Sequence, residues 1–77
     1  MRILIIGSSG QLGTELARQL SSQHQVIGID IVPGAWTHHL MNITDQDAIA
    51  AVMKGVDAVI HIASYALPER FAELNQR

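Results

Sequence analysis

The feature that most constrains this chain is a glycine-spaced turn near its N-terminus, Gly7-Ser-Ser-Gly10-Gln-Leu-Gly13. Four consecutive aliphatic residues, 3–6, come directly before it and are typical of a strand that is buried on both faces. Leucines at every fourth position follow it and predict a helix over 11–22. A glycine turn that joins a buried strand to a helix N-terminus is a suitable binding site for a phosphate group.

The rest of the chain alternates strand patterns with helix patterns. Strands are predicted at 25–30, 37–40 and 57–62, and helices at 45–54 and from Pro68 onward. Alternation at this spacing indicates right-handed strand–helix–strand units and a parallel sheet. We therefore predict an α/β fold, the N-terminal half of a Rossmann-type doubly wound parallel sheet, with about four strands and with helices on both faces.

The second helix has start and stop signals of its own. Thr44 is expected to be its N-cap, and Gly55 is expected to end it. Asp45 and Asp47 would lie in its first turn, where carboxylates suit the helix dipole. Its inward face is predicted to carry Ala48, Ile49, Val52 and Met53.

Composition excludes several classes of function. A formal net charge of −2 with one lysine, Lys54, argues against binding to a nucleic-acid backbone. The absence of cysteine removes disulfides and thiolate metal sites, and no two histidines among His24, His38, His39 and His61 have helical i, i+4 spacing, so we predict no metal site. The apolar runs are far shorter than the roughly 20 residues that span a bilayer. We expect a soluble, cytoplasmic protein that binds neither nucleic acid nor membrane.

Each glycine of the turn has a predicted role in holding a pyrophosphate. Gly7 permits the tight turn, Gly10 lets the backbone approach the phosphates, and Gly13 removes a side chain where helix and strand pack closely. The backbone amides of Gln11 and Leu12 are the expected donors, because the first amides of a helix have no intrahelical acceptor.

Asp30 ends the second predicted strand, and its carboxylate can accept hydrogen bonds from the diol of an adenosine ribose. The same charge would repel a 2′-phosphate, and the next residues, Ile31 and Val32, supply no cation to bind one. We therefore predict NAD as the cofactor in preference to NADP, with Asp30 and Ile31 in its site. The alternative for Asp30 is a solvated loop residue without a ligand.

The Gly-x-x-Gly-x-x-Gly spacing resembles the extended short-chain dehydrogenase/reductase family, the NAD-dependent epimerase/dehydratase group, and the resemblance covers essentially the whole chain. Gly10-Gln-Leu-Gly is also similar to the pattern of sugar-nucleotide reductases. By resemblance, Asn42 and Ile43 lie where the family binds adenine, although the family usually has Asp in place of Asn42. The segment 57–64 resembles the strand Asp-x-Val-x-His-Leu-Ala-Ala, which implies that the cofactor near its nicotinamide half contacts Ile62, Ala63 and Ser64.

The catalytic pair of that family, Tyr-x-x-x-Lys, has no counterpart here. The only tyrosine, Tyr65, is followed four positions later by Glu69. The resemblance therefore implies a partial NAD(P)-binding Rossmann domain over 1–77, without a substrate domain and not catalytic alone. We expect the N-terminal portion of a longer sugar-nucleotide epimerase, dehydratase or reductase, which binds the ADP half of NAD. One alternative is a non-catalytic module that senses dinucleotides, and another is that half a cleft binds nothing.

Three further expectations concern individual residues. Ser8 and Ser9 are interpreted as turn residues rather than nucleophiles, and His61 as a core or cleft residue rather than a catalytic one. Trp36 either packs over the adenine or caps the sheet. The strand at 57–62 would have an unpaired outer edge, which predicts either self-association or poor order near the C-terminus.

Overall fold

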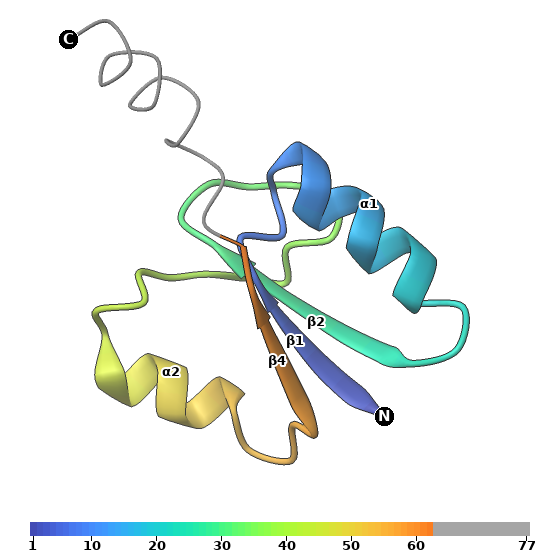
Figure 1. The fold of residues 1–77 in the computed structure, drawn as a ribbon. Helices are drawn as coiled ribbons and strands as arrows, with labels where there is room; N and C mark the ends of the chain where they lie inside the picture. The colour runs from blue at the N-terminus through green and yellow to red at the C-terminus, as the bar shows by residue number, and fades with distance from the viewer. Residues whose placement is uncertain (63–77) are drawn as a thin grey trace, which may run out of the picture.

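The structure is a computed structural model that describes residues 1–62 (Figure 1). These residues form one sheet of four parallel strands in the order β3-β2-β1-β4, together with two helices. The elements in chain order are β1 (Arg2–Ile6), α1 (Gln11–Leu20), β2 (Gln25–Asp30), β3 (His39–Leu40), α2 (Gln46–Val52) and β4 (Ala58–His61). The predicted parallel α/β sheet is thereby confirmed, whereas the helix expected from Pro68 lies outside the described residues.

The two helices cover opposite faces of the sheet, as predicted (Figure 1). Successive residues of β1 point to opposite faces, so this central strand contributes to two separate apolar clusters. The cluster on the α1 side contains the buried residues Ile3, Ile5, Ala17 and Ile62. The cluster on the α2 side contains the buried residues Leu4, Ile27 and Ile29, against which Ile49 and Val52 of α2 pack.

Helix α1 begins without a side-chain cap, since Gly10 is its N-cap, and it ends at Leu20, before the predicted Ser22. Its sheet-facing side carries Ala17, which is fully buried. On the exposed side, hydrogen bonds from Arg18 and then Gln19 lower the pKa of the Glu15 carboxyl to about 2. Because Glu15 and Arg18 are both solvent-exposed, this ion pair contributes little to stability.

Helix α2 corrects two expectations. Its N-cap is Asp45, whose Oδ1 accepts a hydrogen bond from the Ala48 amide at 3.2 Å, and not Thr44. Asp and Thr are both good N-cap residues. A backbone hydrogen bond from the Asp45 amide to the Asn42 carbonyl closes a turn that ends at Asp45, so the helix starts after Asp45 and not after Thr44. Met53 follows the helix as its C-cap and is 42% exposed, so the prediction that it points inward is wrong.

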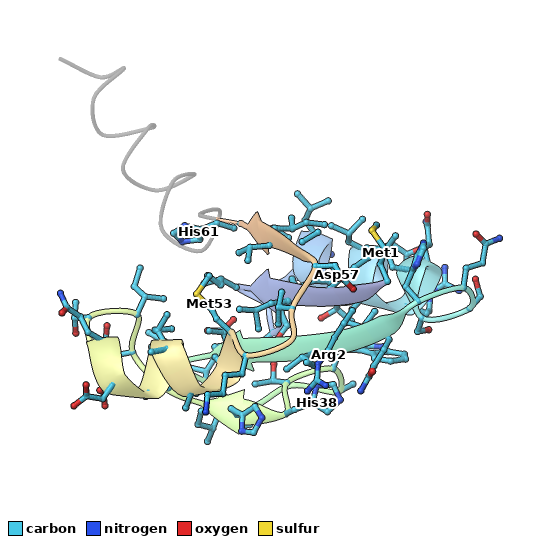
Figure 2. All side chains as sticks on the ribbon, turned by 90° about the horizontal axis from the view of Figure 1, so that it is seen from below. Met1, Arg2, His38, Met53, Asp57 and His61 are labelled. Carbon is cyan, nitrogen blue, oxygen red and sulfur yellow. The ribbon has the colours of Figure 1, made fainter. Side chains whose placement is uncertain are left out.

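Within residues 1–62, strand β4 lies at one edge of the sheet and is only partly buried. Its residues alternate between half-buried and exposed, because Ala58 and Ile60 pack against the α1-side cluster while Val59 and His61 point to the other face. At its start, β4 is tied to β1 by Asp57, whose amide donates to the Arg2 carbonyl and whose Oδ2 accepts from the Arg2 amide, both at 2.8 Å (Figure 2).

Strand β3 is shorter than the predicted 37–40, because His38 bonds to β2 in a different way. The Nδ1 atom of the His38 ring accepts a hydrogen bond from the Gly28 amide at 2.9 Å, and the His38 amide donates to the Gly28 carbonyl at 2.8 Å. The ladder with β3 begins only at the pair Ile29 and His39. Neither helix of the described part is long and apolar enough to cross a membrane.

Candidate functional site

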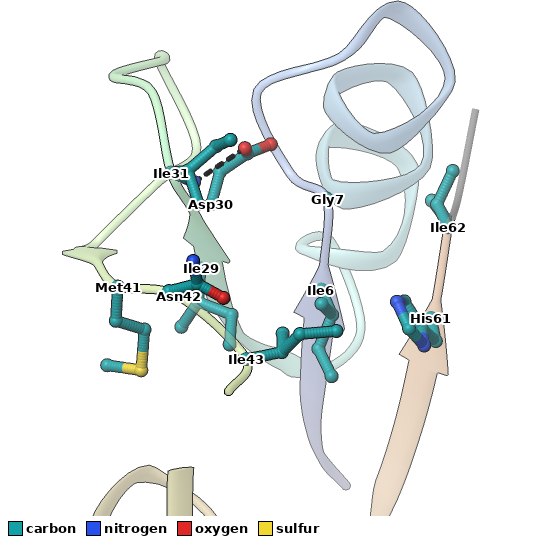
Figure 3. Close-up of a pocket in the computed structure, with 10 residues that line it drawn as sticks. All are labelled: Ile6, Gly7, Ile29, Asp30, Ile31, Met41, Asn42, Ile43, His61 and Ile62. Carbon is teal, nitrogen blue, oxygen red and sulfur yellow. Dashed lines mark hydrogen bonds between the residues drawn. The ribbon is translucent and has the colours of Figure 1, made fainter. Parts of the chain in front are cut away.

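The carboxyl ends of all four strands meet at one edge of the sheet, and a pocket of about 150 Å³ opens there (Figure 3). In parallel α/β sheets this is the edge at which ligands bind. The pocket is lined by Ile6, Gly7, Ile29, Asp30, Ile31, Met41, Asn42, Ile43, His61 and Ile62. The structure thus gathers six residues of the predicted cofactor site, namely Gly7, Asp30, Ile31, Asn42, Ile43 and Ile62.

The glycine turn leads from this pocket into α1. Gly7 has a φ of 98°, which non-glycine residues rarely adopt, and a Cβ there would lie 2.4 Å from the Ile62 carbonyl oxygen. A Cβ on Gly13 would lie 2.1 Å from the Gly7 carbonyl oxygen. Both positions therefore require glycine on steric grounds, in the way that the spacing predicts.

The start of α1 leaves backbone donors available. The first helical hydrogen bond runs from the Thr14 amide to the Gly10 carbonyl at 2.9 Å, so the amides of Gln11 and Leu12 precede the ladder. No acceptor for either amide is recorded within residues 1–62. Gly10 itself has φ −73° and ψ 171°, an extended conformation that any residue can adopt. Its predicted role, room for a phosphate, stays a prediction.

The Asp30 carboxylate links β2 to the glycine turn. Its Oδ2 accepts from the Ser9 amide at 3.0 Å, and its Oδ1 accepts from the Ile31 amide at 2.7 Å and the Val32 amide at 3.4 Å. Each carboxylate oxygen has further lone-pair capacity, so these bonds orient the group and leave it able to accept from a ligand. No lysine or arginine lines the pocket, so the carboxylate charge is not neutralised there by a side chain of the described residues.

The loop before α2 adds a second polar group to the pocket wall. The Asn42 side-chain oxygen accepts from the Thr44 amide at 3.1 Å, which holds the side chain in place while a second lone pair stays free. Most of the remaining wall is aliphatic. The pocket therefore combines a mostly apolar lining with the carboxylate of Asp30 and the amide group of Asn42, which suits a flat, partly polar ring.

Four pocket residues were not predicted as site residues: Ile6, Ile29, Met41 and His61. All four lie at the carboxyl ends of strands, so the strand-end rule, applied to every strand, would have found them. Met41 was interpreted as core, and His61 proves to be a cleft residue, exposed and without a recorded partner among residues 1–62. Ala63 and Ser64 lie outside the described residues.

Two open alternatives are also decided by contacts. Trp36 packs against the α1-side cluster and does not line the pocket, which supports its role in capping the sheet. The Ser8 hydroxyl bonds to Thr37 and the Ser9 hydroxyl to the Val32 carbonyl, both in the loop after β2, as turn residues do. Within residues 1–62, no three potential metal ligands come together.

Comparison with known proteins places this geometry in a family context. The family model described as the RmlD substrate binding domain matches residues 1–76. An uncharacterized protein of Mycobacterium tuberculosis is 41% identical over 69 residues, which cover 82% of this chain and 8% of that protein. A uronate dehydrogenase of Pseudomonas putida is 28% identical over 80 residues, which cover 95% of this chain and 30% of the enzyme.

Two solved structures are similar as well. One is a short-chain dehydrogenase/reductase superfamily protein from Agrobacterium tumefaciens with bound NAD, with a TM-score of 0.73 and 26% identity over 97% of this chain and 25% of that one. The other is a protein from Listeria innocua, with a TM-score of 0.58 and 33% identity over 79% of this chain and 30% of that one. The chain thus spans less than a third of the length of each relative.

Proposed function

Because the chain belongs to the RmlD substrate binding domain family, with the fold of the extended short-chain dehydrogenase/reductases, we propose that it binds the ADP half of NAD. One observation carries the proposal. The pocket at the carboxyl ends of the four strands is continuous, through Gly7, with a glycine turn whose following amides precede the helical ladder. A unit of this kind would serve a sugar-nucleotide epimerase, dehydratase or reductase.

Each group of residues would contact the part of NAD that its chemistry suits. The amides of Gln11 and Leu12 would donate to the pyrophosphate, where the helix dipole also favours negative charge. The Asp30 carboxylate would accept from the ribose hydroxyls, and Asn42 and Ile43 would hold the adenine. When bound, NAD supplies a nicotinamide ring that accepts or donates a hydride. The acid–base pair Tyr-x-x-x-Lys of the family is not among the residues of this sequence.

Calorimetric titration with NAD and NADP tests this function. We expect NAD to bind and NADP to bind at least about tenfold more weakly, because a 2′-phosphate would lie against the Asp30 carboxylate with no cation in the pocket wall. ADP should bind with an affinity close to that of NAD, since the contacts described here serve the ADP half. Equal affinities for NAD and NADP would contradict the cofactor preference, and the absence of NAD binding would contradict the proposed function.

We further propose that two copies of the chain associate through β4. Within residues 1–62 this strand pairs only with β1, and Val59 is 42% exposed beside the unpaired edge. Such edges are templates for strand pairing, and a lysine placed in them opposes it. Sedimentation should therefore show a dimer that the variant Val59→Lys converts to monomer, while Ala50→Lys, at an exposed site on α2, should stay dimeric. A monomeric parent chain would overturn this proposal.

A further inference from the structure

One threonine of the loop after β2 contacts both serines of the glycine turn. Thr37 Oγ1 lies 2.5 Å from Ser8 Oγ and 2.6 Å from Ser9 Oγ. Ser9 Oγ also lies 2.6 Å from the Val32 carbonyl oxygen, and Ser8 Oγ lies 3.3 Å from the Ile29 carbonyl oxygen. A single hydroxyl from a residue 28 positions after Ser9 thus joins two consecutive turn residues.

The directions of these bonds follow from counting protons. Each hydroxyl has one proton to donate, and a carbonyl oxygen can only accept. Ser9 therefore donates to the Val32 carbonyl, so Thr37 must donate to Ser9 and Ser8 must donate to Thr37. The three hydroxyls form one chain, from Ser8 through Thr37 and Ser9 to Val32, in which every proton is used. The longer contact of Ser8 with Ile29 is secondary to it.

The loop after β2 and the glycine turn also pack so closely that neither can move without moving the other. A Cβ on Gly34 would lie 2.6 Å from Ser9 Oγ, and a Cβ on Gly28 would lie 2.6 Å from Ser8 Oγ. Ser8 is fully buried, and its carbonyl accepts a hydrogen bond from the Thr14 hydroxyl of α1 at 2.9 Å. A displacement of Ser8 would therefore be passed on to the start of the helix.

We propose that Thr37 is a positioning residue of the dinucleotide site: its hydroxyl holds Ser8 and Ser9 where the amides of Gln11 and Leu12 can meet a pyrophosphate. This inference rests on the proposed function and adds a residue that lies neither in the glycine motif nor in the pocket wall. A methyl carbon in place of the Thr37 hydroxyl would have to lie about 3.3 Å from each serine oxygen. It would displace the turn by about 0.7 Å, the difference between that separation and the 2.6 Å contact.

The test compares Thr37→Val, Thr37→Ser and the control Thr44→Val, an exposed threonine whose hydroxyl has no recorded bond within residues 1–62. Thr37→Val should weaken ADP binding about tenfold, the effect of losing one hydrogen bond, and should weaken adenosine binding distinctly less, because adenosine has no phosphate. Thr37→Ser should restore ADP binding, and Thr44→Val should match the parent chain. A purely structural role for Thr37 would change the affinities of both ligands equally or of neither, and would overturn the proposal.

Amide hydrogen exchange of the ligand-free chain separates this inference from the proposed function. Protection of the Ser9 amide, which donates to Asp30, should fall in Thr37→Val and be retained in Thr37→Ser. If the parent chain binds no ADP, the proposed function fails and exchange still reports on the hydroxyl chain. Should Thr37→Val not fold, Thr37→Ala removes the hydroxyl without the added methyl group, and unchanged Ser9 protection in that variant contradicts the inference.

Discussion

Replacing Gly28 with alanine should destabilise the chain by about 3 kcal/mol or more, the upper range for overpacking a well-packed interior. A Cβ at this position in β2 would lie 1.8 Å from the Trp36 carbonyl oxygen and 2.7 Å from Ser8 Cβ. Trp36 cannot move away easily, because His38, two residues later, is bonded to both the amide and the carbonyl of Gly28. In a domain of this size such a loss is a large share of the total stability.

Urea unfolding, followed by circular dichroism and by the fluorescence of the single tryptophan, measures the effect. The control is Gly55→Ala, where a Cβ would meet nothing closer than an Arg2 guanidinium nitrogen at 3.9 Å but the φ of 74° disfavours alanine. Its expected cost is about 1 kcal/mol, that of a left-handed conformation alone. If Gly28→Ala costs no more than Gly55→Ala, the close approach of the loop to β2 is not a constraint.

The second large effect is expected from Asp30→Asn, which should lower NAD affinity by about a hundredfold, or about 3 kcal/mol. The two carboxylate oxygens of Asp30 accept from different backbone amides, Ser9 on one oxygen and Ile31 on the other. An asparagine side chain has one acceptor and one donor, so it would set an N–H against one of these amides. It would also lose the charge that favours bonds from the ribose hydroxyls.

Asp30→Asn should also bring the affinities for NAD and NADP closer together, because the repulsion between residue 30 and a 2′-phosphate disappears with the charge. Calorimetry with both dinucleotides measures the two affinities, and Asp47→Asn, which removes an exposed carboxylate from the first turn of α2, serves as the control. An Asp30→Asn variant that binds NAD as tightly as the parent chain would show that this carboxylate does not contact the ribose.

How well the sequence predicted each element depended on how local its signal was. The strand at Gln25–Asp30 has the predicted bounds, and α1 starts at the predicted residue, since the apolar period and the glycine turn are both contained in short windows. The cap of α2 was misassigned because Thr44 and Asp45 are adjacent and equally suited, and a backbone bond to Asn42 chose between them.

The sequence by itself determined the parallel α/β architecture, the position of the glycine turn, and the strand end at which Asp30 lies. These follow from periodicity and from the rule that the carboxyl ends of parallel strands share one edge. Only the tertiary structure decided that Gly28 must be glycine and that Thr37 joins Ser8 to Ser9. Those features depend on contacts between residues that are distant in the chain. The distances in these contacts are set by how the loops pack against the sheet, and such packing leaves no local pattern in the sequence.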